Sequence, residues 1–373
     1  MRKKPQNERR QGTAILTSSA NRLAGLSDTT QWALLAALSG VFVTVLDLAG
    51  LPAAFFLGPV AAGIITGVNG ASVRVPRVFY IAAQAIMGLF IASAITPSIL
   101  ASFLKEWPVI IGIVFSIIAA SSFLGFVMSR WHVMPGTTSV WGSSPGAAAA
   151  MIIMAEEFGA DARLVAFMQY FRVVCVAGLA SVVGALWTHA SGAAHPAAPW
   201  FAPLHGKAFA ETLLLAGSCA LAGRVLHIPS GPMLLALLSG SVMTLTGTLE
   251  IELPRWLLAA TYALLGWGVG LNFTPSVLSH ALKAVPKVLL SVAALISFCG
   301  ALAYLLTRTL GIDALTAYLA TSPGGMDSIA IIAASTHVDV PFVMALQTIR
   351  FLIIVMTGPW VARLVARHME KAA

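Results

Sequence analysis

The sequence predicts an all-α polytopic membrane protein with two homologous repeats, about ten full transmembrane helices and two interrupted or re-entrant helices. The 373 residues are 58% hydrophobic and 10% charged, with a mean hydropathy of +0.88, a composition that a soluble domain could not solvate. Apolar stretches of about 17–25 residues, the length that crosses a bilayer, recur along the chain. A single offset, which places position 144 on position 322, aligns more than 90 residues of one half with the other without a gap.

The order of the elements follows from these stretches. A basic, polar segment, 1–31, lacks the apolar core of a secretory signal peptide and is expected to form a cytoplasmic tail. The first repeat, 32–187, has expected spans at 32–50, 52–68, 77–95, 108–129 and 161–187. A linker rich in Ala, Pro and His, 188–208, precedes the second repeat. That repeat, 209–366, has expected spans at 209–223, 231–247, 256–273, 286–307 and 340–365, before a C-terminal tail, 367–373.

Each repeat also holds one segment that is not a clean span, 137–155 and 315–335. Both contain helix breakers, Ser144, Pro145 and Gly146 in the first and Ser322, Pro323, Gly324 and Gly325 in the second. A broken helix is tolerated in a bilayer only where protein or a water-filled cavity surrounds the break. Paired breaks in duplicated halves are typical of a transporter binding site, where half-helix N-termini face an anionic group. A kink without a ligand is the alternative.

An arginine lies deep in the final span of each repeat. Arg172 and Arg350 each fall about 11 residues into that span, about 16 Å along a helix. Such a depth prevents easy snorkelling, so each arginine should face the bundle interior and have a partner. Gln169 and Gln347 precede the arginines by three residues and share their helix face. Bracing of the carbonyls freed at the breaks and binding of an anion are both compatible with this pattern.

The matching positions reveal an internal duplication. Nine positions are identical between 144–172 and 322–350, and the same offset pairs Asp161 with Asp339. If the broken segments dip in and return, each repeat crosses five times and the repeats are inverted. Lys and Arg then number 16 inside and 4 outside. Six crossings per repeat give 15 and 5, so the positive-inside rule does not decide, although the N-terminus is cytoplasmic either way.

The acidic residues have several interpretations. Asp161 and Asp339 precede the final spans and fit helix N-caps. Asp327 follows the second break and has no counterpart in the first repeat, so it is a candidate for H⁺ or Na⁺ coupling or for a cap. No HExxH or P-loop motif occurs, and the three cysteines are unpaired in spacing. We therefore expect no enzymatic activity, no metal site and no cofactor.

The segments "SSPGAAAAMIIMAEEFGADARLVAFMQYFR" and "TSPGGMDSIAIIAASTHVDVPFVMALQTIR" resemble the two signature segments of the bacterial AbrB-duplication membrane family. The resemblance covers about residues 32–367, with Ala147 where a second glycine is usual. The family carries two labels, regulator of gene expression and ammonia monooxygenase. It also resembles the cation/proton antiporter and anion transporter superfamily, whose inverted repeats contain interrupted helices. That kinship favours the inverted arrangement here.

These observations lead to one expectation for function. We expect a multi-pass protein of the bacterial inner membrane, a secondary transporter (permease) of a small anionic solute held by Gln169, Arg172, Gln347, Arg350 and the broken segments. The lipid bilayer and the solute are the expected partners, nucleic acid is not, and a homo-oligomer is compatible with the sequence. A membrane sensor or indirect regulator without transport is the alternative. The monooxygenase label lacks support, because no span offers clustered His and carboxylate ligands for copper or iron.

Overall fold

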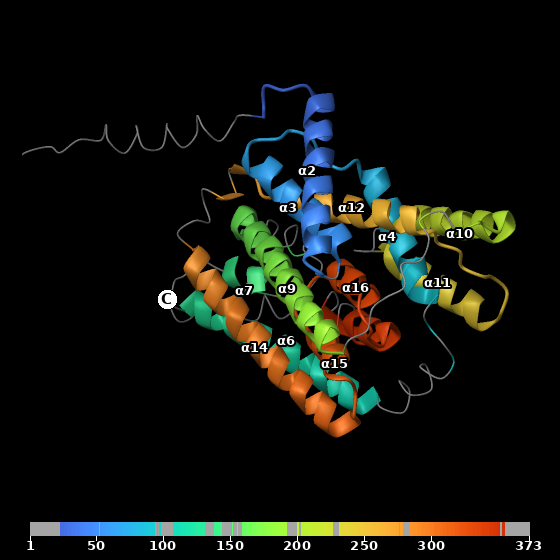
Figure 1. Cartoon of the computed structure of the whole chain (residues 1–373). Helices are drawn as coiled ribbons and strands as arrows, with labels where there is room; N and C mark the ends of the chain where they lie inside the picture. Colours follow the sequence, from blue (N-terminus) through green and yellow to red (C-terminus); the bar gives the residue numbers. More distant parts are fainter. Residues whose placement is uncertain are drawn as a thin grey trace, which may run out of the picture.

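The chain is α-helical throughout the part that the structure describes, and no strand occurs there. The structure is a computed structural model (Figure 1). It describes residues 23–51, 53–93, 95, 97, 107–130, 138–143, 151, 155, 159–191, 200, 203–226, 231–275, 277–278, 284–350 and 353–354, without the side chains of 187–191, 326 and 327. The predicted all-α class is confirmed for these residues.

The helices follow the predicted spans closely. Those before residue 192 are α2 (Asp28–Leu48), α3 (Ala54–Val68), α4 (Arg77–Ser93), α6 (Trp107–Arg130), α7 (Thr138–Ser143) and α9 (Ala162–Ser191). Those after it are α10 (Gly206–Val225), α11 (Gly231–Leu245), α12 (Arg255–Gly270), α14 (Val285–Leu310), α15 (Ala314–Thr321) and α16 (Met326–Ala334). A further helix covers 340–350 and 353–354. Each predicted span begins within four residues of the first residue of a helix.

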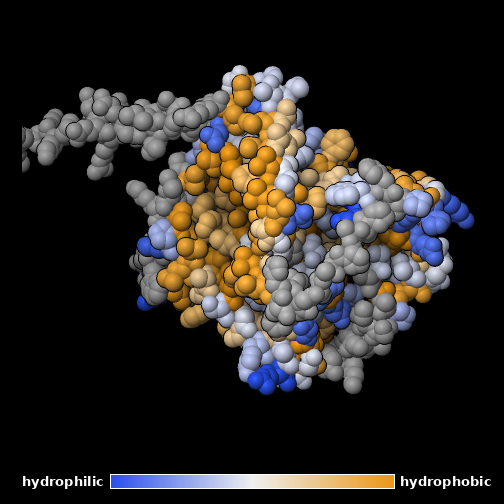
Figure 2. All heavy atoms as spheres, viewed as in Figure 1, coloured by the Kyte–Doolittle hydropathy of each residue, from blue (hydrophilic) through white to orange (hydrophobic). Residues whose placement is uncertain are grey.

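The helix lengths and surface fit a membrane protein. Among the described residues, five helices, α2, α6, α9, α10 and α14, are long and apolar enough to cross a bilayer. Shorter apolar helices are α3, α4 and α11. Leu48, Leu214 and Leu290 point outward, and Figure 2 shows apolar side chains gathered across the face that α2 crosses. Such a surface needs lipid around it, so the chain is a helical membrane protein.

The helices pack in two groups (Figure 1). In the first, α3 packs between α2 and α12, and α4 packs against α10, α11 and α12. In the second, α6 packs on α7, α14 on α15, and α7 on α9. The contacts of α3 with α12, and of α4 with α10, α11 and α12, join helices from the two halves of the sequence. In the second group, α9 carries Gln169 and Arg172, and the end of α15 bonds to Gln347 and Arg350.

Glycines allow the close approach of helices in the first group. A Cβ at Gly88 of α4 would overlap the carbonyl oxygen of Met233 on α11. A Cβ at Gly270 of α12 would overlap the carbonyl oxygen of Val60 on α3. Small residues at such crossings let backbones pack directly where no hydrophobic effect drives association. These contacts join α4 to α11 and α12 to α3.

The Ser-Pro-Gly-Gly segment of the second repeat, 322–325, interrupts the helix. Asp313 caps α15, since its Oδ2 accepts the N–H groups of Leu315 and Thr316 at 3.1 and 3.0 Å. The helix ends at Thr321, Ser322 is extended, and α16 begins only after Gly325. Pro323 lacks an N–H and restricts the residue before it to extended backbone. The break thus leaves carbonyl groups of α15 without partners inside the helix.

Candidate functional site

Arg350 and Gln347 fill the interruption between α15 and α16. Arg350 donates from Nη1 to the carbonyl of Ser322 at 2.6 Å and from Nη2 to that of Gly324 at 3.0 Å. Its Nη2 also donates to Gln347 Oε1 at 2.6 Å. Gln347 Nε2 in turn donates to the carbonyls of Leu319 and Ser322, at 2.9 and 3.1 Å. The pair therefore satisfies the carbonyls that the break frees, as the bracing alternative predicts.

Arg172 and Gln169 make similar contacts at the end of α7. Arg172 donates from Nη1 to the carbonyl of Ser143 at 3.0 Å and from Nη2 to Gln169 Oε1 at 2.7 Å. Gln169 Nε2 donates to the carbonyl of Trp141 at 2.9 Å. Ser121 on α6 also donates to the Ser143 carbonyl, at 2.5 Å. The last carbonyls of α7 are thus held by two other helices.

Several contacts recur at equivalent positions of the two halves, those that the offset of the duplication aligns. Gln169 bonds to Trp141 as Gln347 bonds to Leu319. The N–H of Asp161 donates to Thr138 Oγ1 at 3.1 Å, and that of Asp339 donates to Thr316 Oγ1 at 3.2 Å. Further bonds cap the two final helices, from the N–H groups of Arg163 and Leu164 to Asp161 Oδ1 and from that of Phe342 to Asp339 Oδ1. The N-cap prediction for both aspartates is confirmed.

The two arginines form a buried, positively charged centre. Each is only 3% exposed. The two guanidinium groups lie within Coulombic range of one another, and the thiol of Cys299 on α14 lies within range of both. Every hydrogen-bond partner of Arg350 in the described chain is an uncharged oxygen. A buried cation without a carboxylate is costly unless an anion joins it.

Unused donors accompany this charge. Arg350 Nε, Ser322 Oγ and Tyr318 Oη are buried without a hydrogen-bond partner among the described residues. Guanidinium has five N–H donors, and three of those on Arg350 have acceptors. Tyr318 and Ser322 are neighbours at the end of α15, where the N–H of Ser322 donates to the carbonyl of Tyr318 at 2.9 Å. Donors without acceptors suit a ligand that supplies only acceptors.

Comparisons with known proteins identify the family. A sequence model described as "Transition state regulatory protein AbrB" matches residues 55–366. An Escherichia coli (strain K12) protein named "Putative regulator AbrB" is 43% identical over 342 residues, 91% of this chain and 98% of that protein. The chain belongs to the AbrB family. A Bacillus subtilis (strain 168) protein named "Uncharacterized protein YhjN" is 26% identical over 306 residues, 77% of this chain and 79% of that protein. The resemblance drawn from the sequence segments is confirmed.

The structure of the AbrB-family chain places the predicted site residues unevenly. It brings together Ser322, Gly324 and the two glutamine–arginine pairs, with Pro323 and Gly325 in the same break. Asp327 lies in the first turn of α16, and its side chain is outside the description. Ser144, Pro145 and Gly146 lie outside the described residues. The last described residue before them, Ser143, accepts from Arg172.

Two site residues were missed by sequence reasoning. Cys299 lies within Coulombic range of both arginines, and its carbonyl accepts from Thr321 Oγ1 at 3.0 Å. Ser121, at the equivalent position of the first half, bonds to Ser143. The offset that aligns the breaks also aligns Ser121 with Cys299 and Ser143 with Thr321. That alignment is the signal that could have found both.

A small cavity in the AbrB-family chain borders Arg172. Its volume is about 10 Å³, the space of about one water molecule. The lining residues come from α6, α7, α9 and α14: Leu124, Gly142, Ser143, Met168, Arg172, Val288, Ser291, Val292 and Leu295. Arg172 therefore borders a cavity in this conformation.

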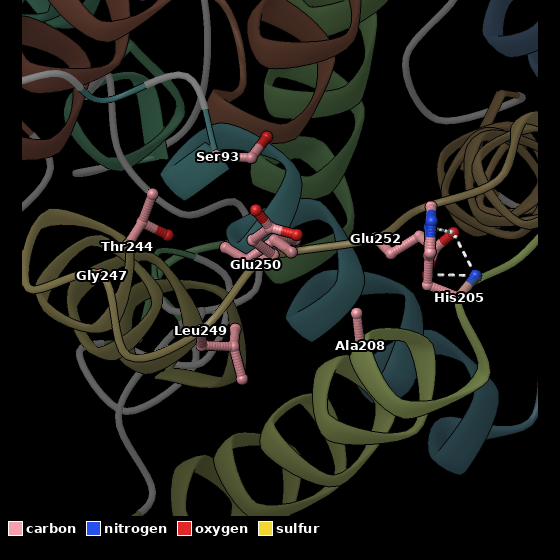
Figure 3. Close-up of a pocket in the computed structure, with 9 residues that line it drawn as sticks. Ser93, His205, Ala208, Thr244, Gly247, Leu249, Glu250 and Glu252 are labelled. Atoms are coloured by element: carbon pink, nitrogen blue, oxygen red, sulfur yellow. Dashed lines mark hydrogen bonds and ion pairs between the residues drawn. The ribbon is translucent and has the colours of Figure 1, made fainter.

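A larger cavity of about 470 Å³ lies where α4 ends and α10 begins (Figure 3). Ser93, Glu250 and the His205–Glu252 pair line it, and Glu250 projects toward its centre. The N–H of His205 donates to Glu252 Oε1 at 3.0 Å and joins the start of α10 to the loop before α12. No group of three or more His, Cys, Asp or Glu that could hold a metal ion occurs in the described part of the chain.

Proposed function

We propose that this AbrB-family protein is a secondary transporter of a small anionic solute in the bacterial inner membrane. The observation that carries the proposal is the buried Arg350, whose partners in the described chain are all uncharged and whose Nε has none. A second guanidinium, that of Arg172, lies within Coulombic range. Two like charges in an apolar surrounding are stabilised by a counter-ion, and a solute anion would supply it.

Bracing and binding are compatible roles for the same side chains. Hydrogen bonds to Ser322, Gly324 and Gln347 hold Arg350 in a fixed orientation, which lowers the entropy cost of binding a ligand. The N–H groups at the start of α16 add the positive end of a helix dipole. We propose that Asp327, in that first turn, carries the coupled H⁺ or Na⁺.

Inverted repeats, with ten full spans and two interrupted helices, form part of the proposal. They are supported by the directions of α4 and α12, which occupy matching positions in the two halves. Ser93 at the end of α4 and Glu252 just before α12 border the same cavity. The end of one helix therefore lies beside the beginning of its counterpart, as an inverted arrangement requires. The excess of Lys and Arg supports a cytoplasmic N-terminus.

A membrane sensor is the second candidate. The name of the Escherichia coli relative, "Putative regulator AbrB", favours it. A sensor would bind the same anion in the same centre and alter gene expression indirectly, without moving the solute. Affinity without flux would distinguish it from a transporter.

The first experiment is thermal unfolding of the purified full-length protein with sodium acetate, nitrate, phosphate or sulfate. A ligand that binds only the folded state raises the free energy of unfolding by mass action, by about 2.7 kcal/mol at 100 times its Kd. The melting temperature rises with it. We expect one anion class to stabilise the wild type and the exposed control Arg308→Gln, with Arg172→Gln and Arg350→Gln tested beside them. The stabilising anion is then loaded into proteoliposomes for flux. No shift with any anion in the wild type would reject the proposal.

A further inference from the structure

The two arginines differ in what packs around them. Beside Arg172, the cavity is lined from α7 and α14 by Gly142, Val288, Ser291 and Leu295. The residues at the equivalent positions of the other half are Ala320, Ile110, Ile113 and Ile117. The latter four belong to one buried cluster together with Leu346, which is four residues before Arg350.

The larger side chains close the Arg350 side. Ile110, Ile117 and Ala320 are wholly buried, and Ile113 is only 5% exposed. Relative to these residues, Gly142 lacks a methyl group, Val288 lacks one methylene, and Ser291 replaces an apolar side chain by a small hydroxyl. Protein interiors are packed closely enough that a difference of a few methyl groups decides whether a void remains. The Arg172 side has a cavity, and the equivalent positions on the Arg350 side carry larger side chains that leave less free volume.

We infer that an anion reaches the arginine pair from the side of Arg172, through a crevice between α6, α9 and α14, while apolar side chains close the opposite side, at Arg350. This inference rests on the proposed function. Val288 lies in the first turn of α14, and Leu295 lies seven residues further, about 10 Å deeper. In this inference the crevice opens toward the beginning of α14, the side that the charge distribution assigns to the cytoplasm.

Met168 is the side chain that closes the crevice. It lines the cavity next to Arg172, and a Cβ at Gly142 would overlap its sulfur. The cavity holds about one water in this conformation, so an anion can enter only when this covering side chain moves. A flexible, unbranched thioether suits such movement better than a branched side chain. Gly142 gives Met168 the room that it occupies when the crevice is closed.

The test is cysteine labelling in full-length protein with a negatively and a positively charged methanethiosulfonate reagent. Ser291→Cys should react from the side where α14 begins, and Ile113→Cys, its counterpart beside Arg350, should not. Leu290→Cys, which faces outward to lipid, is the neighbouring control. A positively charged cleft concentrates anions about tenfold or more, so Cys at 291 should prefer the negative reagent by about that factor over the positive one. Wild-type labelling gives the background from native cysteines.

Two second-site variants test whether Arg172 causes the preference for the negative reagent and whether Met168 limits access to position 291. Arg172→Gln in the Ser291→Cys protein should abolish the charge preference, and Met168→Ala should raise the labelling rate with the preference retained. Equal labelling at 113 and 291, equal rates for both reagents, or a preference that survives Arg172→Gln would each overturn the inference. None of the cysteine variants alters an arginine, so the comparison of 113 with 291 does not depend on the folding of an arginine variant.

The experiment also separates this inference from the proposed function. Sodium acetate, nitrate, phosphate and sulfate are added as protectants of the cysteine at 291. Charge-selective labelling without protection or a thermal shift by any of the four rejects anion transport and retains the crevice. Stabilisation by an anion together with equal labelling of both positions rejects the crevice and retains anion binding.

Discussion

The sites of Arg172 and Arg350 have the same hydrogen-bonding pattern and different packing. In each, arginine Nη2 donates to a glutamine Oε1, and Nη1 donates to a carbonyl at the end of a short helix. Around them, Gly142 and Ser291 line a cavity, whereas the larger Ala320 and Ile113 stand at the equivalent positions and belong to a buried apolar cluster. The comparison teaches that polar side chains fix the geometry of such a centre, whereas the volume of apolar neighbours decides its access.

The largest expected effect is a loss of stability when Arg350 no longer holds the carbonyls of the break between α15 and α16. Arg350→Gln removes the donor to the carbonyl of Gly324 and one of the two donors to that of Ser322, where apolar packing excludes water. Hydrogen bonds to a charged group contribute about 1.5–3 kcal/mol each, so we expect a loss of about 4 kcal/mol in the free energy of unfolding. Arg172→Gln should cost less, since water in the neighbouring cavity can reach the carbonyl of Ser143.

Thermal unfolding of the two variants in one detergent measures this difference. Arg308→Gln, on an exposed face of α14, controls for the loss of an arginine as such. A larger fall in melting temperature for Arg172→Gln than for Arg350→Gln would contradict the assignment of the brace.

A smaller effect follows from opening the sealed site. Ile113→Ala removes apolar volume from a full core and should cost about 3 kcal/mol, whereas Ser291→Ala, at a half-buried cavity wall, should cost about 0.5 kcal/mol. Chemical denaturation or thermal unfolding measures both. Equal costs would show that the two positions are packed alike and would remove the basis of the comparison.

The next largest effect on stability is expected from filling the cavity beside Arg172. Gly142→Ala places a methyl group against the sulfur of Met168, and such overpacking costs about 1–3 kcal/mol. The displaced Met168 should fill the cavity, so labelling of a cysteine at 291 should slow. Gly178→Ala on α9, where nothing lies within 4 Å of the added Cβ, is the control. Faster labelling in Gly142→Ala would mean that Met168 does not cover the crevice.

Sequence patterns predicted most of the helices and part of the site. Apolar length gave spans that match the helices within four residues at their starts, because the bilayer fixes how long a helix must be. The Pro-Gly-Gly segment predicted the break between α15 and α16, because proline and glycine impose it locally. The spacing of Gln347 and Arg350 predicted a shared face, and they do bond.

The unpredicted features depend on contacts distant in sequence. Which carbonyls accept from Arg350 depends on how α15 packs, and sequence reasoning left bracing and binding open. The cavity beside Arg172 depends on Ser291, which belongs to the other half of the chain. A serine is not unusual in an apolar span. Only comparison with the equivalent position, Ile113, shows that a large apolar side chain is absent at 291. Side-chain volumes summed across three helices are not a local property of any segment.

The smallest expected effect tests the part of the comparison in which the sites agree. Thr138→Val and Thr316→Val keep side-chain shape and remove the hydroxyl that accepts the N–H of Asp161 or Asp339. A lost hydrogen bond of this kind costs about 1 kcal/mol, and we expect similar falls in melting temperature. Thr316 also donates to Asp313 at 3.4 Å, a long bond that adds little. If only one variant were destabilised, the two sites would differ in their hydrogen-bonded frame as well as in packing, and their unequal access could no longer be assigned to side-chain volume alone.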